Sequence, residues 1–452
     1  MASAAAAEEK TVVQPATPPA APSARRIEAL DFVRGVALCG ILLMNIIDFG
    51  LPDAYTNPQN SGGATGINLV TWVITEIGFE GTQRALFSML FGASVILFTS
   101  RLEAQGRTDA ADLYMRRNLW LVGFGMVNAF LLLWHGDILY SYGIVALFVF
   151  AFRKLAAKWL LLIGLASLLA GAAWNYQETR GTLAVHAPYP AAAAGAAAAR
   201  AAEEDATQAQ ETAIADWEAE KAEYVSSPET IAQKIRDYTG GYAHAFAYMA
   251  GVNVIYQTYG LYRYFFDVFG MMLIGMALFR LGVLTLERRT GLYVAMLLGG
   301  YAVGLATNAV ETKHIMDNGF DALAFAEVST TYDLGRLGMT IGHLGLLLLF
   351  VRSGILGFVR RAFAAVGRMA ITNYLMHSVI CLVLFILMGN YGQLERHQLY
   401  YVVFAIWAFQ LVLSPLWLKY FKFGPVEWLW RSLTYMKPQP MRRGRPAPTG
   451  RR

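Results

Sequence analysis

Ten apolar runs, each about long enough to cross a lipid bilayer as an α-helix, constrain the fold of this chain more than any other feature. Only 15% of the 452 residues are charged, whereas soluble domains carry about a quarter. The sequence therefore predicts an all-α fold class, a polytopic helical membrane protein with about ten transmembrane helices. The predicted spans are 33–50, 82–100, 114–133, 138–153, 157–175, 261–281, 291–308, 336–352, 369–389 and 399–418.

Lysine and arginine gather before the first run, in every second connection after it, and behind the last run. Cytoplasmic loops of membrane proteins carry such an excess of positive charge. The pattern predicts an even number of spans with both termini in the cytoplasm. The basic segments are 25–34, 101–117, 153–158, 280–289, 352–368 and 419–443.

The connections and termini divide the chain into five parts. Residues 1–28 are rich in alanine and proline and predict a disordered cytoplasmic tail without the apolar core of a signal peptide. Two five-helix membrane halves, 29–175 and 241–418, flank a polar segment at 176–240. That segment predicts a partly helical periplasmic insertion, or alternatively a variable, partly disordered loop. At 419–452, a Gly-Pro break, two tryptophans and basic residues predict an interfacial helix and a basic tail.

Two further segments leave the helix count open. Residues 68–80 are amphipathic and predict an interfacial or half-inserted helix before the second span. Residues 241–260 are aromatic and weakly polar, which is also compatible with a re-entrant segment.

Composition narrows the classes of partner. Cys39 and Cys381 both fall inside apolar runs, so no disulfide framework is expected. The positive charge is explained by the topology, and the sequence contains no nucleic-acid-binding module. Membrane lipid is therefore an expected partner, and nucleic acid is not. The seven histidines are too scattered to predict a metal site. The sequence leaves the oligomeric state open, with a homo-oligomer as one alternative.

Polar residues at the outer ends of the spans form the first candidate site. Asn45 and Asp48 end the first span, while His135 and Asp137 lie in the turn before the fourth. A histidine beside a carboxylate is the minimal arrangement for a general base, with Asp137 orienting His135. The alternatives are that Asp137 caps the next helix and that His135 is structural.

An arginine inside the membrane needs an anionic partner, and Arg84 lies at the outer part of the second span. Asp48 and Glu80 are its expected carboxylate partners. Arg84 could equally hold a carboxylate or phosphate of a substrate.

A second candidate site lies at the inner end of the first span. Asp31 and Arg34 are spaced for a salt bridge within one helix. The functional alternative is that Arg34 faces a cytoplasmic opening and binds an anionic donor group, aided by the basic loops.

Two polar pairs interrupt later spans. Asn373 and His377 are four residues apart and share a helix face, which predicts that they line a central cavity and contact substrate. The alternative is an interhelical hydrogen bond. Arg263 and Asp267 are also one turn apart, so we expect them to pair with each other.

These motifs resemble the YeiB-type family of bacterial inner-membrane proteins, whose members are mostly uncharacterised and have often been described as transporters. The resemblance covers nearly all of residues 27–435 and implies a multi-pass protein of the bacterial cytoplasmic (inner) membrane. The blocks that carry it are 30–37 continuing to 44–46, 90–93, 136–139 with 142–143, 367–375 and 424–435.

The first block is also distantly similar to a transmembrane acyltransferase superfamily that includes the lysosomal heparan-sulfate glucosaminide acetyltransferase. In its bacterial enzymes an arginine is followed, after ten residues, by an essential histidine. Arg34 matches the arginine, whereas Asn45 stands in the place of the histidine. The resemblance implies acyl-CoA or acetyl-CoA as donor and a small-molecule or glycan acceptor. His135 is then the proposed replacement for the missing base.

Three functions follow as hypotheses. The first is transfer of an acyl group, with Arg34 and Asp31 binding the donor, His135, Asp137 and Asn45 in catalysis, and Asp48, Arg84, Asn373 and His377 binding substrate. The second is transport or export of a small polar or lipid-linked compound through the same intramembrane charges. The third is a membrane scaffold that binds a partner through 176–240.

Overall fold

The computed structural model describes residues 24–443, and every regular secondary-structure element in that range is helical. The all-α fold class is therefore confirmed. Of the predicted tail at 1–28, residues 1–23 lie outside the described part, while 24–28 belong to the first helix. The helices are α1 (Ala24–Gly50), α2 (Gly66–Phe79), α3 (Thr82–Ala104), α4 (Ala110–Met126), α5 (Leu139–Val149), α6 (Ala157–His186), α7 (Tyr189–Ala201), α8 (Gln208–Ala222), α9 (Pro228–Thr239), α10 (Tyr242–Ile255), α11 (Leu261–Arg280), α12 (Thr290–Asp317), α13 (Ala322–Val328), α14 (Tyr332–Ser353), α15 (Gly357–Arg368), α16 (Ala370–Cys381), α17 (Arg396–Tyr420) and α18 (Pro425–Tyr435).

All ten predicted spans fall on helices, and eight helical segments of the described chain are long and apolar enough to cross a membrane. The other two predicted spans are weaker for physical reasons. The helix at 114–133 carries Arg116 and Arg117, and the apolar helix at Leu139–Phe152 is short. The two ambiguous segments become α2 and α10, which lead into α3 and α11 and lengthen those spans to Gly66–Ala104 and Tyr242–Arg280.

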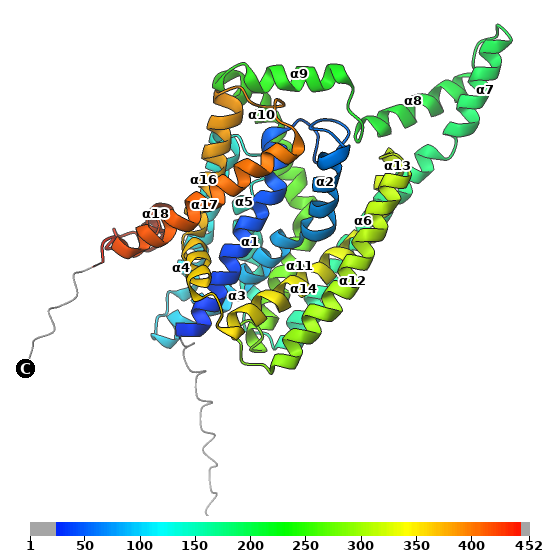
Figure 1. The fold of residues 1–452 in the computed structure, drawn as a ribbon. Helices are drawn as coiled ribbons and strands as arrows, with labels where there is room; N and C mark the ends of the chain where they lie inside the picture. The colour runs from blue at the N-terminus through cyan, green and yellow to red at the C-terminus, as the bar shows by residue number, and fades with distance from the viewer. Residues whose placement is uncertain (1–23, 444–452) are drawn as a thin grey trace, which may run out of the picture.

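The central element of the bundle is α1, which packs against α3, α15, α16 and α17 (Figure 1). Next to it α11 packs between α3 and α6, while α12 and α14 pair along their lengths. Beyond the predicted end of the fifth span, α6 continues to His186. The segment 176–240 is helical, with α7 and α8 standing away from the bundle and α9 lying across its top (Figure 1).

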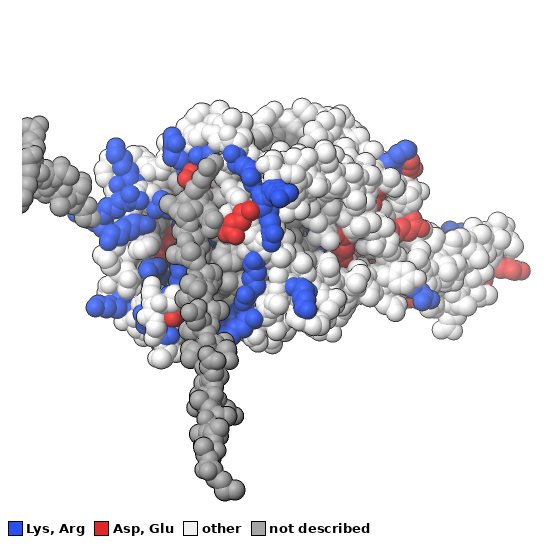
Figure 2. All heavy atoms as spheres, turned by 90° about the horizontal axis from the view of Figure 1, so that it is seen from below, with Lys and Arg blue, Asp and Glu red and all other residues white. Residues whose placement is uncertain are grey.

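Basic side chains cover the end of the bundle where α1 begins. Figure 2 shows this end from below, with Lys and Arg spread over the bundle. Because the basic side of a membrane protein faces the cytoplasm, this is the inner end, and the end that carries α9 is the outer one. At the inner end α18 packs against α4, and the Trp430 indole N–H donates to the carbonyl of Arg117 at 2.7 Å.

Glycines allow the central helices to approach each other closely. A Cβ atom at Gly92 of α3 would lie 1.9 Å from the Met272 carbonyl oxygen, and one at Gly275 of α11 would lie 1.9 Å from that of Met89. Small residues at such crossings let backbones pack directly in membrane bundles. The α3–α11 contact matters for function because both helices contribute walls to the cavities described below.

We expect Gly92→Ala to destabilise the protein by about 1–3 kcal/mol, because the added methyl group must displace the α11 backbone. Thermal unfolding in detergent measures the effect. The matched control is Gly78→Ala in α2, where a Cβ meets nothing within 4 Å. Equal unfolding temperatures for the two variants would show that the α3–α11 contact is not tight.

Candidate functional site

A cavity of about 410 Å³ lies in the outer half of the bundle and gathers most of the predicted outer site. Its walls come from α1, the α2–α3 junction, the turn before α5, α6, α11 and α14. Predicted residues among its lining are Asn45, Asp48, Arg84, His135 and Asp137. Five residues that the sequence placed on the first span, on the second span and in the turn before the fourth therefore share one space.

The carboxylate partner of His135 is Asp48, not Asp137. The His135 Nε2 atom lies 3.6 Å from Asp48 Oδ2, and both side chains are largely buried. The imidazole packs edge-on against the Tyr256 ring, with centroids 4.6 Å apart, and the His135 carbonyl accepts from Gln257 Nε2. A histidine beside a carboxylate is thus present, with Asp48 in the place expected for Asp137, and its role as a general base stays a prediction.

Asp137 has the capping role that the sequence left as an alternative. Its Oδ2 accepts the backbone N–H of Tyr140 at 2.8 Å in the first turn of α5, and its Oδ1 accepts from Asn128 Nδ2 at 2.8 Å. Burial raises the pKa of Asp137 to about 7, against the opposing effect of these hydrogen bonds. A carboxyl with both oxygens occupied positions the turn and does not orient His135.

Asn45 lies one turn before Asp48 on α1, and its side chain makes no hydrogen bond to any described residue. Amide groups at membrane depth normally find a partner. The Asn45 amide in the cavity wall is therefore free to bind a ligand or water.

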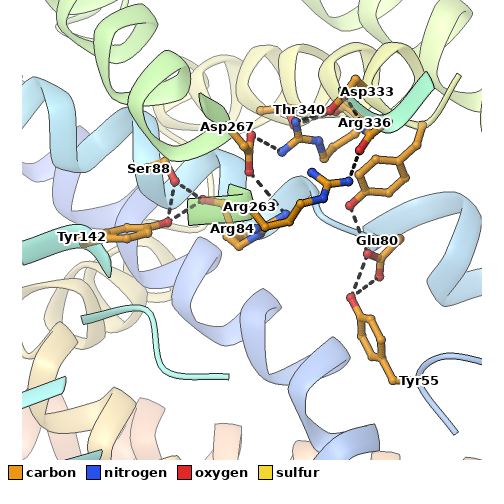
Figure 3. Close-up of polar contacts among 12 residues, drawn as sticks. Tyr55, Glu80, Arg84, Ser88, Tyr142, Arg263, Asp267, Asp333, Arg336 and Thr340 are labelled. Carbon is orange, nitrogen blue, oxygen red and sulfur yellow. Dashed lines mark hydrogen bonds and ion pairs between the residues drawn. The ribbon is translucent and has the colours of Figure 1, made fainter. Parts of the chain in front are cut away.

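An ion network crosses the cavity from α3 to α14 (Figure 3). Arg336 donates to Asp267 at 2.5 Å and to Asp333 at 2.7 Å, and the second oxygen of Asp267 lies 3.4 Å from Arg84. The predicted pair of Arg263 with Asp267 is wrong, since Arg263 binds Glu178 of α6 at 2.6 Å. The expectation for Arg84 is also wrong, because its carboxylate partner is Asp267 and neither Asp48 nor Glu80 forms an ion pair with it in the described chain.

Glu80 completes the network at the junction of α2 and α3. Its carboxylate accepts the hydroxyl of Tyr55 at 2.8 Å (Figure 3). It also accepts the hydroxyl of Tyr332 at 3.2 Å. Gly81, in the left-handed conformation at φ 64°, allows the sharp turn after it, and a Cβ there would lie 2.3 Å from the Tyr332 hydroxyl. Sequence reasoning missed both tyrosines, since Tyr55 lies in a loop and Tyr332 is the first residue of α14, where neither belongs to a periodic pattern.

A second cavity, of about 170 Å³, lies toward the inner end. Arg34, Arg117 and Arg368 line it, together with apolar side chains such as Phe87 and Trp430. Arg34 also donates to Asp31 at 2.9 Å. Arg34 thus forms the expected salt bridge within α1 and also lines a cavity, while its binding of an anionic donor group stays a prediction.

Ile138 and Tyr142 line both cavities, so they form the wall between the inner and outer spaces. The Tyr142 hydroxyl lies 2.5 Å from Ser88 Oγ and 3.1 Å from the Arg84 carbonyl oxygen (Figure 3). The cavity in the outer half and the cavity toward the inner end thus share two side chains at the start of α5.

Glu427 of α18 also lines the inner cavity. Its Oε1 accepts the backbone N–H groups of Ile371 and Thr372, at 2.7 and 2.9 Å, so it caps the start of α16. Burial raises its pKa, opposed by the bonds from Thr372. Helix α18 is thereby attached to the cavity wall.

Asn373 and His377 lie away from both cavities, contrary to the expectation of a shared central cavity. Asn373 Nδ2 donates to Ser414 Oγ at 3.1 Å, and His377 Nε2 lies 3.1 Å from Gln410 Oε1. Both residues are buried between α16 and α17. They form an interhelical polar network, the alternative that the sequence left open.

Comparison with known proteins establishes the family. A family model described as "Protein of unknown function (DUF418)" matches residues 278–437. The uncharacterized protein YeiB of Escherichia coli (strain K12) is 31% identical over 414 residues, covering 90% of this chain and 95% of YeiB. The chain belongs to the YeiB family. A second relative, the uncharacterized protein YxaH of Bacillus subtilis (strain 168), is 29% identical over 438 residues, 92% of this chain and 96% of YxaH. No solved structure matches.

Family membership confirms the YeiB-type resemblance inferred from the sequence blocks. With its apolar helices, the chain is a multi-pass membrane protein of that family. The more distant likeness to acyltransferases stays a prediction.

Proposed function

We propose that this protein transfers an acyl group from cytoplasmic acyl-CoA to an acceptor at the outer face of the bacterial cytoplasmic membrane. The observation that carries the proposal is the pair of cavities that share only the wall of Ile138 and Tyr142. A donor held on the basic side and an acceptor held on the other side would meet there. Neither would have to cross the bilayer.

The inner cavity suits the acyl end of acyl-CoA and the start of its anionic part. Arg34, Arg117 and Arg368 offer guanidinium groups, which bind phosphate through paired N–H donors. Apolar side chains between them and Tyr142 suit the acyl chain. Because the cavity holds only about 170 Å³, the nucleotide would stay at the basic surface.

The outer cavity supplies a base for the acceptor. His135, oriented by Asp48, would take the proton of an acceptor hydroxyl or amine as its oxygen or nitrogen attacks the thioester carbonyl. The new C–O or C–N bond forms, the C–S bond breaks, and the CoA thiolate leaves and is protonated. Asn45 would donate a hydrogen bond to the developing oxyanion or hold the acceptor.

The first experiment measures thermal unfolding of the detergent-purified protein with and without acetyl-CoA. A ligand that binds only the folded state raises the unfolding temperature by mass action. We expect saturable stabilisation that is lost in Arg34→Ala. The matched control is Arg289→Ala, which removes an exposed arginine at the start of α12 outside the inner cavity and should leave the shift unchanged.

No shift at millimolar acetyl-CoA would contradict the donor site. Equal loss of the shift in both arginine variants would assign it to general positive charge rather than to the cavity.

Transport of a small polar or lipid-linked compound is the second candidate function. The same observation favours it, since two cavities separated by a thin wall also describe an alternating path, and the Arg84–Asp267–Arg336 network could mark that path. Proteoliposomes distinguish the two functions. Transport moves a solute without changing it covalently, whereas acyl transfer consumes acetyl-CoA.

A further inference from the structure

A third cavity, of about 190 Å³, opens beside the outer cavity and has no part in the chemistry proposed above. It lies between α2 and α12, with one wall from the start of α17. Three carboxylates line it, Glu76, Glu80 and Glu311. Tyr55, Glu80 and Tyr332 belong to the walls of both spaces, so the side cavity and the outer cavity adjoin.

The charges of this side cavity do not balance within the protein. Arg336 lines it but is occupied by Asp267 and Asp333. Arg396 is the remaining cation, and its Nη2 donates to the Ala54 carbonyl oxygen rather than to a carboxylate. Glu80 accepts the hydroxyls of Tyr55 and Tyr332 in the ion network described above, so the two remaining carboxylates, Glu76 and Glu311, face one guanidinium, which favours a cationic ligand.

Polar groups in the same walls lack partners. Thr312 is 1% exposed, and its hydroxyl oxygen makes no hydrogen bond in the described chain. The buried Nε of Arg396 has none either, and no described residue donates a hydrogen bond to the Glu76 carboxylate. Polar groups withdrawn from water are costly without partners. These three groups therefore point to a polar occupant from outside the chain.

We propose that the side cavity binds an ammonium group of the acceptor, with Glu76 and Glu311 as its counter-charges. This assignment rests on the proposed acyl transfer. The Thr312 hydroxyl and the Arg396 Nε would contact an oxygen close to the ammonium group, so the ligand class is an amino alcohol.

The anchoring determines which group of the acceptor is acylated. A protonated amine held between carboxylates has no lone pair for attack on a thioester. The nucleophile must then be a second hydroxyl of the same molecule, distinct from the oxygen beside the ammonium group, that extends into the outer cavity toward His135. Its oxygen forms the ester C–O bond, its proton goes to His135, and the C–S bond to CoA breaks. The expected product is an O-acylated amine.

The test compares two small probes in the thermal-unfolding assay, ethanolamine and its neutral analogue ethylene glycol. We expect ethanolamine to stabilise the protein saturably and ethylene glycol to have no effect. Glu76→Gln should weaken ethanolamine binding about tenfold or more, because it removes a counter-charge from the cavity wall. The matched control is Glu327→Gln on α13, the same change outside the lining of the cavity, and it should bind normally.

Several results would overturn the proposal. These are no shift with ethanolamine, an equal shift with potassium chloride at the same concentration, and undiminished binding by Glu76→Gln. Stabilisation by acetyl-CoA reports that each variant is folded, and Glu311→Gln replaces Glu76→Gln if the latter does not fold. An ethanolamine shift without an acetyl-CoA shift would refute acyl transfer but keep the cation site. An acetyl-CoA shift without an ethanolamine shift would refute the cation site alone.

Discussion

Arg336→Met is expected to destabilise the protein by about 3–5 kcal/mol, because breaking a buried ion pair leaves uncompensated charges. The Arg336 side chain is 2% exposed and is bound to both Asp267 and Asp333. Without it, Asp267 retains only the longer 3.4 Å contact with Arg84. Thermal or denaturant unfolding in detergent measures the loss.

The matched control is Arg263→Met, the same substitution in an ion pair nearer the surface. Glu178, its partner, is 44% exposed, and pairs of this kind contribute about 0–1 kcal/mol. Adding Asp267→Asn to Arg336→Met should recover part of the stability, since it removes one unpaired charge. Similar losses for Arg336→Met and Arg263→Met would show that the network is not a buried structural unit.

The sequence predicted the helices well because apolar length is a local property. The Asp31–Arg34 salt bridge could be predicted equally well, since it depends only on helical spacing within α1. The alternating basic connections also placed Asn45, Asp48, Arg84 and His135 at one end of the bundle. They do line one cavity there.

Pairing between helices could not be predicted in the same way. Arg263 and Asp267 have the spacing of a pair, yet Arg263 extends to Glu178 on α6 while Asp267 faces Arg336 on α14. Which helix lies on each side of α11 depends on its packing, which one sequence does not reveal. The choice of Asp48 over Asp137 as the partner of His135 has the same origin. Asp137 is closer to His135 in the chain, but its two carboxylate oxygens accept hydrogen bonds from Asn128 and Tyr140.

The side cavity could not be predicted from the sequence, for a further reason. Glu76 and Glu311 are separated by more than two hundred residues, and each alone resembles a solvated charge at a helix surface. Only the packing of α2 against α12 turns them toward one space. The observation that points to a ligand between them is the hydroxyl of Thr312, which has no hydrogen-bond partner in the described chain.

His135→Gln is expected to reduce acyl transfer about 10²- to 10⁴-fold, the contribution typical of a general base. Glutamine keeps hydrogen-bonding groups but cannot accept the acceptor proton at neutral pH. Asp48→Asn should cause a smaller loss, because Asp48 acts by orienting the imidazole from 3.6 Å. Membrane vesicles from overproducing cells, supplied with labelled acetyl-CoA, measure the rate through label in the aqueous and lipid fractions.

The control for this loss is His244→Gln. His244 also pairs with a carboxylate, Asp237 at 3.2 Å, and it belongs to the outer end of the bundle but does not line the outer cavity. Acetyl-CoA binding should survive in both variants, since the donor site lies across the Tyr142 wall. A loss of binding in His135→Gln would mean that the substitution disturbs the wall itself. Full activity in His135→Gln would remove the base from the mechanism, and the two cavities would then fit a transport path better than a transfer site.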